Sequence, residues 1–199
     1  MDMQPDLFGT PAPAAAWPQH RTYFAVLPPP RMAQNLERLA KSFGRLHNVR
    51  RVVRAERLHV SLAGLACGAA PAPETLEDAL AMGEAVRVPS FELCFDRLET
   101  WNGGRVRPGR PREPTVLACS APPREADALH DALRRQLQLF GRKAGRRQFN
   151  PHLTLWYAPA SIAPRRLARP LRLRVERFWL VHTVTGGQLE AIASWPLKF

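Results

Sequence analysis

Residues 58–62 of the chain read LHVSL, and residues 151–155 read PHLTL. In each segment a histidine stands two positions before a hydroxyl residue, and apolar residues lie between and around them. Side chains alternate between the two faces of a β-strand. Each segment is therefore predicted to be a strand that buries its apolar face and presents an imidazole beside a hydroxyl on the other. The four presented residues are His59, Ser61, His152 and Thr154.

The two segments lie almost half a chain length apart, and similar elements are predicted around each. Hydrophobic periodicity, proline and glycine divide the chain into strands and helices. In the first half, strands are predicted over 22–27, 49–53, 57–65 and 88–98, and helices over 32–43 and 73–86. In the second half, strands are predicted over 115–119, 152–157, 171–184 and 188–197, with one helix after Pro122-Pro123. This order predicts an α+β fold of two duplicated lobes.

The predicted helices rest on apolar stripes with helical spacing. The stripes are Met32, Leu36, Leu39 and Phe43; Leu76, Ala79 and Leu80; and Ala126, Leu129, Leu133, Leu137 and Phe140. Gly44 is predicted to end the first helix, and Gly141 and Gly145 are predicted to close the third. Gly186-Gly187 marks a hairpin turn between the last two strands.

Composition bounds the class of protein. The 199 residues, of which 45% are apolar, suit one domain of two lobes with a sizeable core. No apolar run approaches the roughly 18 residues of a membrane span, and the N-terminus lacks the pattern of a secretory signal. Cys67, Cys94 and Cys119 are too far apart for a zinc knuckle or a disulfide framework. We therefore expect a cytoplasmic protein with reduced thiols and no membrane contact.

A formal net charge of +12, carried mainly by arginine, indicates an anionic partner. Strongly basic small proteins attract polyanions, and RNA or DNA is the usual candidate. The guanidinium fork can bind two phosphate oxygens at once, and residues 101–114 form a basic loop rich in glycine and proline. An arginine-rich composition can also reflect a genome-wide bias. Charge alone therefore leaves nucleic-acid binding and a merely solvated surface both open.

Residues 1–20 are rich in proline and alanine and lack periodicity, which predicts a disordered tail before a single folded domain over 21–199. Within the tail, Gln4-Pro5-Asp6-Leu7-Phe8 resembles the short motif by which bacterial proteins dock on the replication sliding clamp. Short motifs also arise by chance. A sliding-clamp contact is therefore a hypothesis, which a pull-down of the clamp with the intact protein would test.

The paired histidines suit acid–base chemistry at phosphorus. Displacement there is assisted by one group that takes a proton from the nucleophile and another that protonates the leaving oxygen, and histidine can serve either role. If a pseudo-twofold axis relates the lobes, His59 and His152 face each other across a cleft. The hydroxyls of Ser61 and Thr154 can then donate to non-bridging oxygens. No Asp/Glu cluster stands near either histidine, so neither a metal ion nor another cofactor is expected.

A single His-x-Ser or His-x-Thr in a strand is more often structural, and the pairing of two matched copies is what carries the prediction. The other histidines fit poorly. His20 is placed in the tail, His47 in a basic linker, His130 on a helix flank, and His182 directly before a threonine. All four are predicted to be structural.

The repeated His-x-Ser/Thr motif resembles the signature of the two-histidine (2H) phosphoesterases. Four stretches narrow the resemblance to the bacterial branch of 2′-5′ RNA ligases or RNA 2′,3′-cyclic phosphodiesterases. They are RTYFAVLPPP (21–30), RAERLHVSLAGL (54–65), FNPHLTLWY (149–157) and LVHTVTGGQLEAIASWPL (180–197). The resemblance covers residues 21–197. It implies a bilobal fold with a pseudo-twofold axis, in which each lobe has an antiparallel-rich sheet with helices on its outer face and both motifs line a central groove.

The resemblance also implies an activity, the hydrolysis of a terminal RNA 2′,3′-cyclic phosphate to a 2′-phosphate. Some members are named for a reversible ligation that joins tRNA halves through a 2′-5′ bond. By analogy with the family, His152 activates water, His59 protonates the departing 3′ oxygen, and Ser61 and Thr154 bind the phosphate. Because the two motifs are nearly symmetric, the sequence leaves this order of roles open.

Several further residues are candidates for contact with RNA. Base stacking on aromatic rings and phosphate binding by arginine are the expected contacts. The candidates are Tyr23, Arg146, Arg147, Phe149, Trp156 and Tyr157. Most of the aromatic ones are expected in the core rather than at a base, because aromatic residues in strand patterns usually pack. Two positions depart from the family: Gly64 replaces a frequent large aromatic residue, and Tyr157 replaces an arginine that contacts phosphate in some members.

Three functions stay open at this point. The leading one is an RNA 2′,3′-cyclic phosphodiesterase. A second keeps the same site for small cyclic-phosphate nucleotides or 2′-5′-linked oligonucleotides. A third is a basic RNA-binding module with inert histidines, for which binding would fall steeply with salt while His59→Ala and His152→Ala would change no turnover.

Overall fold

The computed structural model describes residues 19–101, 113–145, 148–158, 162–185 and 187–197. The clamp-like segment, most of the basic loop 101–114, and the candidate contacts Arg146 and Arg147 lie outside the described residues. The strands are β1 (His20–Val26), β2 (Val60–Gly68), β3 (Phe91–Thr100), β4 (Glu113–Ala118), β5 (His152–Ala158), β6 (Arg165–Val175), β7 (Arg177–Val184) and β8 (Leu189–Pro196). The helices are α1 (Pro30–Leu46), α2 (Pro73–Ala85) and α3 (Arg124–Leu139), with a 3-10 turn, η1, over Ala55–Arg57.

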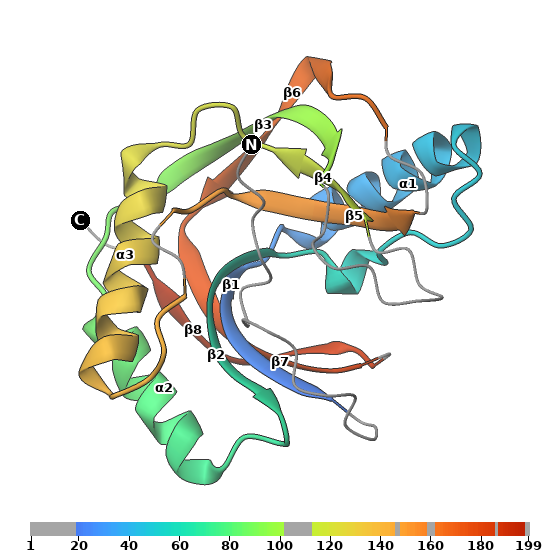
Figure 1. Cartoon of the computed structure of the whole chain (residues 1–199). Coiled ribbons are helices and arrows are strands. Elements are labelled where there is room, and N and C mark those ends of the chain that lie inside the picture. The colour runs from blue at the N-terminus through green and yellow to red at the C-terminus, as the bar shows by residue number, and fades with distance from the viewer. Residues whose placement is uncertain (1–18, 102–112, 146–147, 159–161, 186, 198–199) are drawn as a thin grey trace.

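The strands form two four-stranded sheets in which every neighbouring pair is antiparallel. One sheet, named the His59 sheet, has the order β2-β1-β7-β8, and the other, named the His152 sheet, has the order β5-β4-β3-β6. Figure 1 shows the His152 sheet above the His59 sheet, with α2 and α3 along one side and α1 on the other. The predicted α+β fold of two antiparallel lobes is confirmed.

The two sheets share one connectivity. β1 leads through α1 into β2, and β4 leads through α3 into β5, and in both cases the two strands pair with each other. β1 and β4 hold equivalent inner positions, and β2 and β5 hold equivalent edges. Two strands from elsewhere complete each sheet: β7 and β8 for one, β3 and β6 for the other. The strands of the two histidine motifs are therefore equivalent elements of a repeat.

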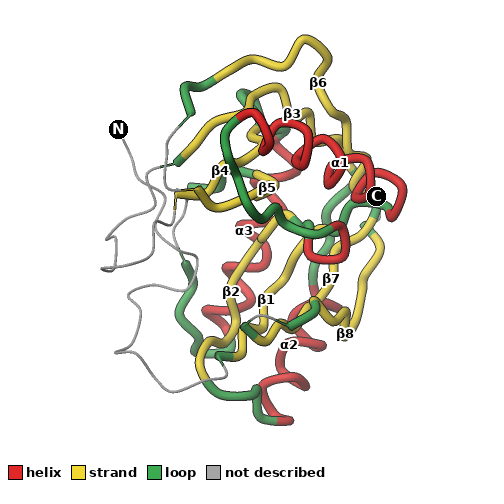
Figure 2. The backbone as a smooth tube through the Cα atoms, turned by 90° about the vertical axis from the view of Figure 1, so that its right-hand side faces the viewer, coloured by secondary structure: helices red, strands yellow, loops and turns green. Residues whose placement is uncertain are grey.

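Each connecting helix contacts the motif strand of the other lobe. α1 contacts β5, and α3 contacts β2, as Figure 2 shows from the side. The predicted stripe of α3 is fully buried at Ala126, Leu129, Leu133 and Leu137. These side chains belong to one continuous core that includes residues of both sheets. Burial of one aliphatic side chain contributes about 1.5–3 kcal/mol, so this stripe fixes α3 against the His59 sheet.

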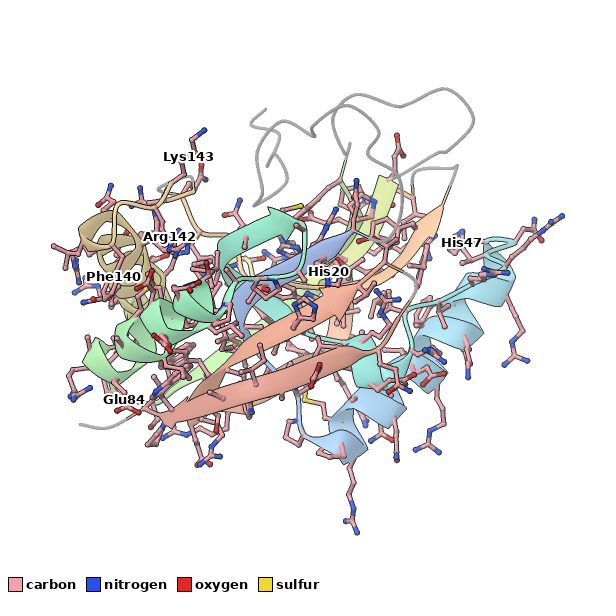
Figure 3. The ribbon with its side chains drawn as sticks, turned by 90° about the horizontal axis from the view of Figure 1, so that it is seen from below. His20, His47, Glu84, Phe140, Arg142 and Lys143 are labelled. Carbon is pink, nitrogen blue, oxygen red and sulfur yellow. The ribbon has the colours of Figure 1, made fainter. Side chains whose placement is uncertain are left out.

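The C-terminal end of α3 is closed by a turn that needs glycine. Gly141 has φ 67°, a conformation that other residues seldom adopt, and the Arg142 N–H donates to the Leu137 carbonyl at 2.8 Å. This is a Schellman motif. The Arg142 guanidinium then reaches Asp78 of α2 at 2.6 Å. Phe140 is 39% exposed at this end (Figure 3), so the predicted stripe extends one residue too far.

Two predicted strands differ from the structure. The stretch 171–184 is not one strand: the chain breaks at Glu176, β6 joins the His152 sheet and β7 joins the His59 sheet. The stretch alternates apolar residues with charged ones up to Arg177 and is mostly apolar after it, and this pattern does not show that the chain leaves one sheet for another. The stretch 49–53 forms only one bridge, between Val52 and Trp156, before the chain turns into η1.

Smaller differences concern which residues face the core. The buried residues of α1 are Ala33, Leu36, Ala40 and Gly44, and those of α2 are Ala79, Met82 and Gly83. Gly44 lies in the last turn of α1 rather than after its end, and it packs closely on Val49. Leu80, predicted for the apolar side of α2, is 40% exposed.

The remaining predictions concern His20, the thiols and membranes. His20 is the first residue of β1 rather than part of a tail, and its Nδ1 lies 3.0 Å from Nε2 of His182. Cys67, Cys94 and Cys119 are free thiols. Among the described residues, no helix combines the length and the apolar character that crossing a bilayer requires.

Candidate active site

The motif strands carry the same irregularity at the same place. His59 stands one residue before β2, and His152 is the first residue of β5. In each strand the register shifts directly after the motif, so that one extra leucine, Leu62 in β2 and Leu155 in β5, has no partner on the neighbouring strand. A bulge of this kind re-aims the side chains that follow it.

The bulge decides which aromatic residue of β5 lies on the same face as the catalytic candidates. Strict alternation would place Trp156 on the face of His152. The bulge instead puts Trp156 in the core at 1% exposure and brings Tyr157, which is 57% exposed, to that face. In β2 the same shift places Gly64 opposite Tyr23. The prediction of Trp156 as a base contact is wrong, because the ring has no accessible face.

Each bulge is bonded to the other lobe through the carbonyl of its extra leucine. Nδ1 of His130 in α3 donates to the Leu62 carbonyl at 2.8 Å. The Val53 N–H donates to the Leu155 carbonyl at 2.7 Å. The buried His130 ring stacks on Phe149, with 4.8 Å between ring centroids and 10° between planes. His130 is therefore structural, and the prediction of Phe149 as an RNA contact is wrong because it is buried in this stack.

The two candidate catalytic histidines are anchored in the same way. Nδ1 of His59 lies 2.7 Å from the Arg57 carbonyl, and Nδ1 of His152 lies 2.8 Å from the Asn150 carbonyl. A carbonyl oxygen only accepts, so Nδ1 carries the hydrogen in both rings. The neutral ring then has an unprotonated Nε2, which can take a proton, and the charged ring has an Nε2–H, which can give one.

Burial lowers the pKa of both histidines. The pKa of His59 falls to about 4, chiefly through burial, and the nearby charges of His152 and Arg57 lower it further. The pKa of His152 is also lowered by burial, and for both rings the bond to a carbonyl partly offsets the effect. Both rings are thus mainly neutral near pH 7 in the free protein. A bound phosphate anion would raise the pKa of each ring again.

Each histidine ring lies against one aromatic side chain. The Tyr23 ring of β1 is 5.1 Å from His59, between centroids, and the ring of Trp101, directly after β3, is 4.4 Å from His152. Burial raises the pKa of Tyr23 to about 12, so its hydroxyl stays protonated and can donate to an anion. Sequence reasoning named Tyr23 and missed Trp101, because the place of Trp101 depends on sheet register rather than on a motif.

The faces that carry the motifs lie toward each other. The charge of His152 acts on His59, and that of Tyr157 acts on Tyr23 across the two sheets. β2 and β5 are also in direct contact. The side chain of Arg57 lowers the pKa of both His59 and Tyr23, so a cation lies beside the pair.

These faces hold the predicted hydroxyls. Ser61 and Thr154 are partly buried, and neither hydroxyl has a hydrogen-bond partner within the part of the chain that the structure describes. In that same part, no group of three His, Cys, Asp or Glu side chains could hold a metal ion. The site thus gathers two anchored imidazoles, two free hydroxyls, a phenol and a guanidinium.

Comparison with known proteins identifies the family. The model of the 2′-5′ RNA ligase superfamily matches residues 9–187. The chain belongs to this superfamily. A comparison with curated proteins gives no match.

Solved structures show the superfamily fold. A crystal structure of a phosphoesterase is 25% identical, with a TM-score of 0.68, and covers 90% of this chain and 99% of its own. Escherichia coli LigT complexed with NADP+ is 25% identical, with a TM-score of 0.67, and covers 92% and 100%. A Thermus thermophilus protein, 23% identical with a TM-score of 0.68, covers 89% and 97%.

Superfamily membership confirms the resemblance read from the sequence. It identifies the protein as an enzyme of the 2H phosphoesterase type. The charge of His152 acts on His59, and Ser61 and Thr154 lie on the strands that follow these two histidines. Of the six other candidates, Tyr23 packs on His59, and Tyr157 interacts with Tyr23. Trp101 and Arg57 are additions that only the three-dimensional arrangement supplies.

Proposed function

We propose that the protein is an RNA 2′,3′-cyclic phosphodiesterase that hydrolyses a terminal cyclic phosphate to a 2′-phosphate without a metal ion. The observation that carries the proposal is the matched anchoring of His59 and His152. Each ring is held through Nδ1 on a carbonyl and keeps Nε2 for the substrate. Two such nitrogens on opposite sides of a phosphate suit an in-line displacement.

In the proposed reaction two protons are transferred, one bond to phosphorus forms and one bond to phosphorus breaks. Nε2 of His152 takes a proton from water while the water oxygen bonds to phosphorus. His59 enters this step as the imidazolium: its ring takes a proton from solvent when the anionic phosphate binds and raises the pKa of the ring. The bond from phosphorus to O3′ breaks, O3′ takes that proton from Nε2 of His59, and the phosphate stays on O2′. Exchange with solvent restores both rings. A 5′-hydroxyl of RNA in place of water would form a 2′-5′ bond by the same steps.

The order of the two roles follows the family resemblance alone. The equal anchoring of the two rings also fits the reverse order. Ser61 and Thr154 lie on the same faces as the histidines, and their hydroxyls would donate to the non-bridging oxygens. The Tyr23 hydroxyl and the Arg57 guanidinium, which lie beside His59, would add a donor and a positive charge.

A row of residues across the His152 sheet favours a polymer over a mononucleotide. His152 pairs with Ala118, Ala118 with Arg97, and Arg97 with Arg166, so all four share one face. Three strand spacings of about 4.8 Å place Arg166 roughly 14 Å from His152. Arg166 is exposed, and at that distance it can contact a backbone phosphate beyond the reacting end. The proposed substrate is therefore an RNA end, such as that of a tRNA fragment.

The test is the hydrolysis of a short RNA with a 2′,3′-cyclic phosphate end in EDTA, followed by determination of the phosphate position. We expect a 2′-phosphate from the wild type and formation of it about 1000-fold more slowly by His59→Ala or His152→Ala. A 2′,3′-cyclic mononucleotide is the second substrate, and Arg97→Gln/Arg166→Gln should lower kcat/KM for the RNA alone. Turnover of the mononucleotide with no preference for RNA would favour the small-nucleotide function, and salt-sensitive RNA binding without turnover would favour a binding module.

Two minor expectations belong with this proposal. The three free cysteines suit a reducing compartment, so we infer that the protein acts in the cytoplasm. The sliding-clamp contact through Gln4–Phe8 stays a prediction for the pull-down described above.

A further inference from the structure

The side chain of Trp101 is held at several points beside His152. Its backbone N–H donates to the Pro114 carbonyl of β4 at 3.0 Å. Its indole Nε1–H donates to Oε1 of Glu99 at 2.7 Å. Its ring then lies 4.4 Å from the His152 ring, between centroids, with 58° between the planes. The indole is thus fixed at its backbone and at its nitrogen, and the imidazole packs against it.

Glu99 itself is held in place on the same face. It pairs with Val116 of β4, and Val116 pairs with Thr154 of β5, so the three residues form one row across the sheet. Its side chain is 14% exposed, and its second carboxylate oxygen lies 3.8 Å from Nη1 of Arg97. The carboxylate is therefore a restrained acceptor for the indole and not a mobile surface group.

We propose that Glu99 and Trp101 are positioning residues for His152: the carboxylate holds the indole, and the indole holds the imidazole in its reactive orientation. The proposal rests on the function proposed above. Neither residue touches the reacting phosphate in this scheme. Both act through the ring of His152.

The single bond from Nδ1 to the Asn150 carbonyl leaves a role for such a support. One hydrogen bond fixes the position of one ring atom, but the ring can still tilt about that bond. Packing against the indole removes this freedom and excludes water from one side of the ring. A displacement of about 1 Å in a reacting group can cost roughly 100-fold in rate, so the orientation of Nε2 is worth supporting.

The chain contains a matched control for this pair. Trp195 of β8 donates its Nε1–H to Oε1 of Glu84 at 2.9 Å. That indole packs on Phe24 and Phe178 in the core, and Glu84 lies at the end of α2, near the edge of the molecule (Figure 3). Glu84→Ala thus breaks the same kind of bond without touching the site.

The experiment compares Glu99→Ala, Glu99→Gln, Trp101→Ala and Glu84→Ala. On the RNA with a cyclic phosphate end, we expect kcat to fall about 10-fold for Glu99→Ala and about 100-fold for Trp101→Ala, with KM little changed. Glu99→Gln keeps an acceptor for the indole and should restore most of the rate. Glu84→Ala should match the wild type.

A second readout does not depend on turnover. NMR titration of the His152 ring should show its pKa rising toward the ordinary value in Trp101→Ala, because burial is the main cause of its lowering. The ring of His182, whose lowered pKa comes from burial and from the charge of His20 and not from His152, serves as the internal reference. If the His152 titration is the same in Trp101→Ala and the wild type, or if Glu84→Ala and Glu99→Ala lose activity equally, the positioning role is wrong. Absence of turnover in the wild type would overturn the proposed function but leave the titration as a test of the contact.

Discussion

The strand that carries His59 and the strand that carries His152 share the same backbone geometry, but different side chains pack on their histidines. Both rings donate from Nδ1 to the carbonyl two residues earlier, and both strands bulge after the hydroxyl residue. The partner of His59 is Tyr23 on the adjacent strand, whereas Trp101, the partner of His152, follows a strand two positions away. A repeat in the chain can thus supply two equal anchors, while the side chains packed on them make the two imidazoles unequal.

The largest effect should come from removing either ring. His59→Ala and His152→Ala should each lower kcat on the cyclic phosphate about 1000-fold, because general acid–base groups contribute roughly 10²–10⁴-fold. The double variant should be hardly worse than the single ones, since the two rings act as a unit. Single-turnover rates on the same RNA measure this. If only one of the two variants lost activity, the two histidines would not have equivalent catalytic roles.

The dependence of stability on pH should come next, because it reports the lowered pKa of both rings. Burial lowers the pKa of His59 from 6.5 to about 4. Between these two pH values the ring is therefore protonated in the unfolded chain and neutral in the folded chain. The free energy of unfolding should therefore fall as the pH falls through this window, by up to about 1.4 kcal/mol per pH unit for one such group. Urea denaturation of the wild type, His59→Asn and His152→Asn would show it. Each variant should have a flatter profile than the wild type, and an unchanged slope in His59→Asn would contradict the lowered pKa.

A third and smaller effect should come from the hydrogen bonds that hold the two bulges. The Leu62 carbonyl receives its hydrogen bond from a side chain, His130, whereas the Leu155 carbonyl receives one from the main chain at Val53. His130→Ala should lower the free energy of unfolding by about 2 kcal/mol, because it leaves a buried carbonyl without its donor. Val53→Ala keeps the main-chain donor and should cost less. Equal losses in urea denaturation would mean that packing, and not the hydrogen bond, decides the effect.

The smallest effect should come from the hydroxyls. Ser61→Ala and Thr154→Val each remove one donor to the phosphate and should lower kcat/KM about tenfold, which corresponds to the roughly 1.5 kcal/mol of a hydrogen bond to a charged group. Initial rates on the RNA measure both. Equal losses would support a phosphate held symmetrically between the strands. A loss for one variant alone would show that the phosphate sits closer to that strand.

Local pattern predicted the strands and faces of this site, and long-range register decided the rest. Alternation correctly placed His152 and Thr154 on one face, opposite the buried Leu153 between them. It failed directly after Leu155, where the bulge exchanges the expected places of Trp156 and Tyr157. No local signal marks that bulge, because the hydrogen bond to the Leu155 carbonyl comes from Val53, which lies far away in the chain.

Trp101 illustrates the same limit from another direction. It lies far from His152 in the sequence and reaches it only because β3 and β4 pair in one register and β4 and β5 in another. The alternation of side chains along one strand does not reveal the registers in which β3, β4 and β5 pair. The break at Glu176 is a similar case: β6 alternates apolar residues with arginines and β7 is mostly apolar, and only the long-range pairing shows that the two strands join different sheets.

The late position of β7 and β8 in the chain has a consequence for synthesis. The His59 sheet needs these two C-terminal strands beside β1, and α3 of the second half covers β2. A nascent chain that already contains both His59 and His152 still lacks β7 and β8, which are half of the strands of the His59 sheet. Truncated chains should therefore be poor phosphoesterases and good substrates for proteases, and two fragments cut between β3 and β4 should fold only when mixed.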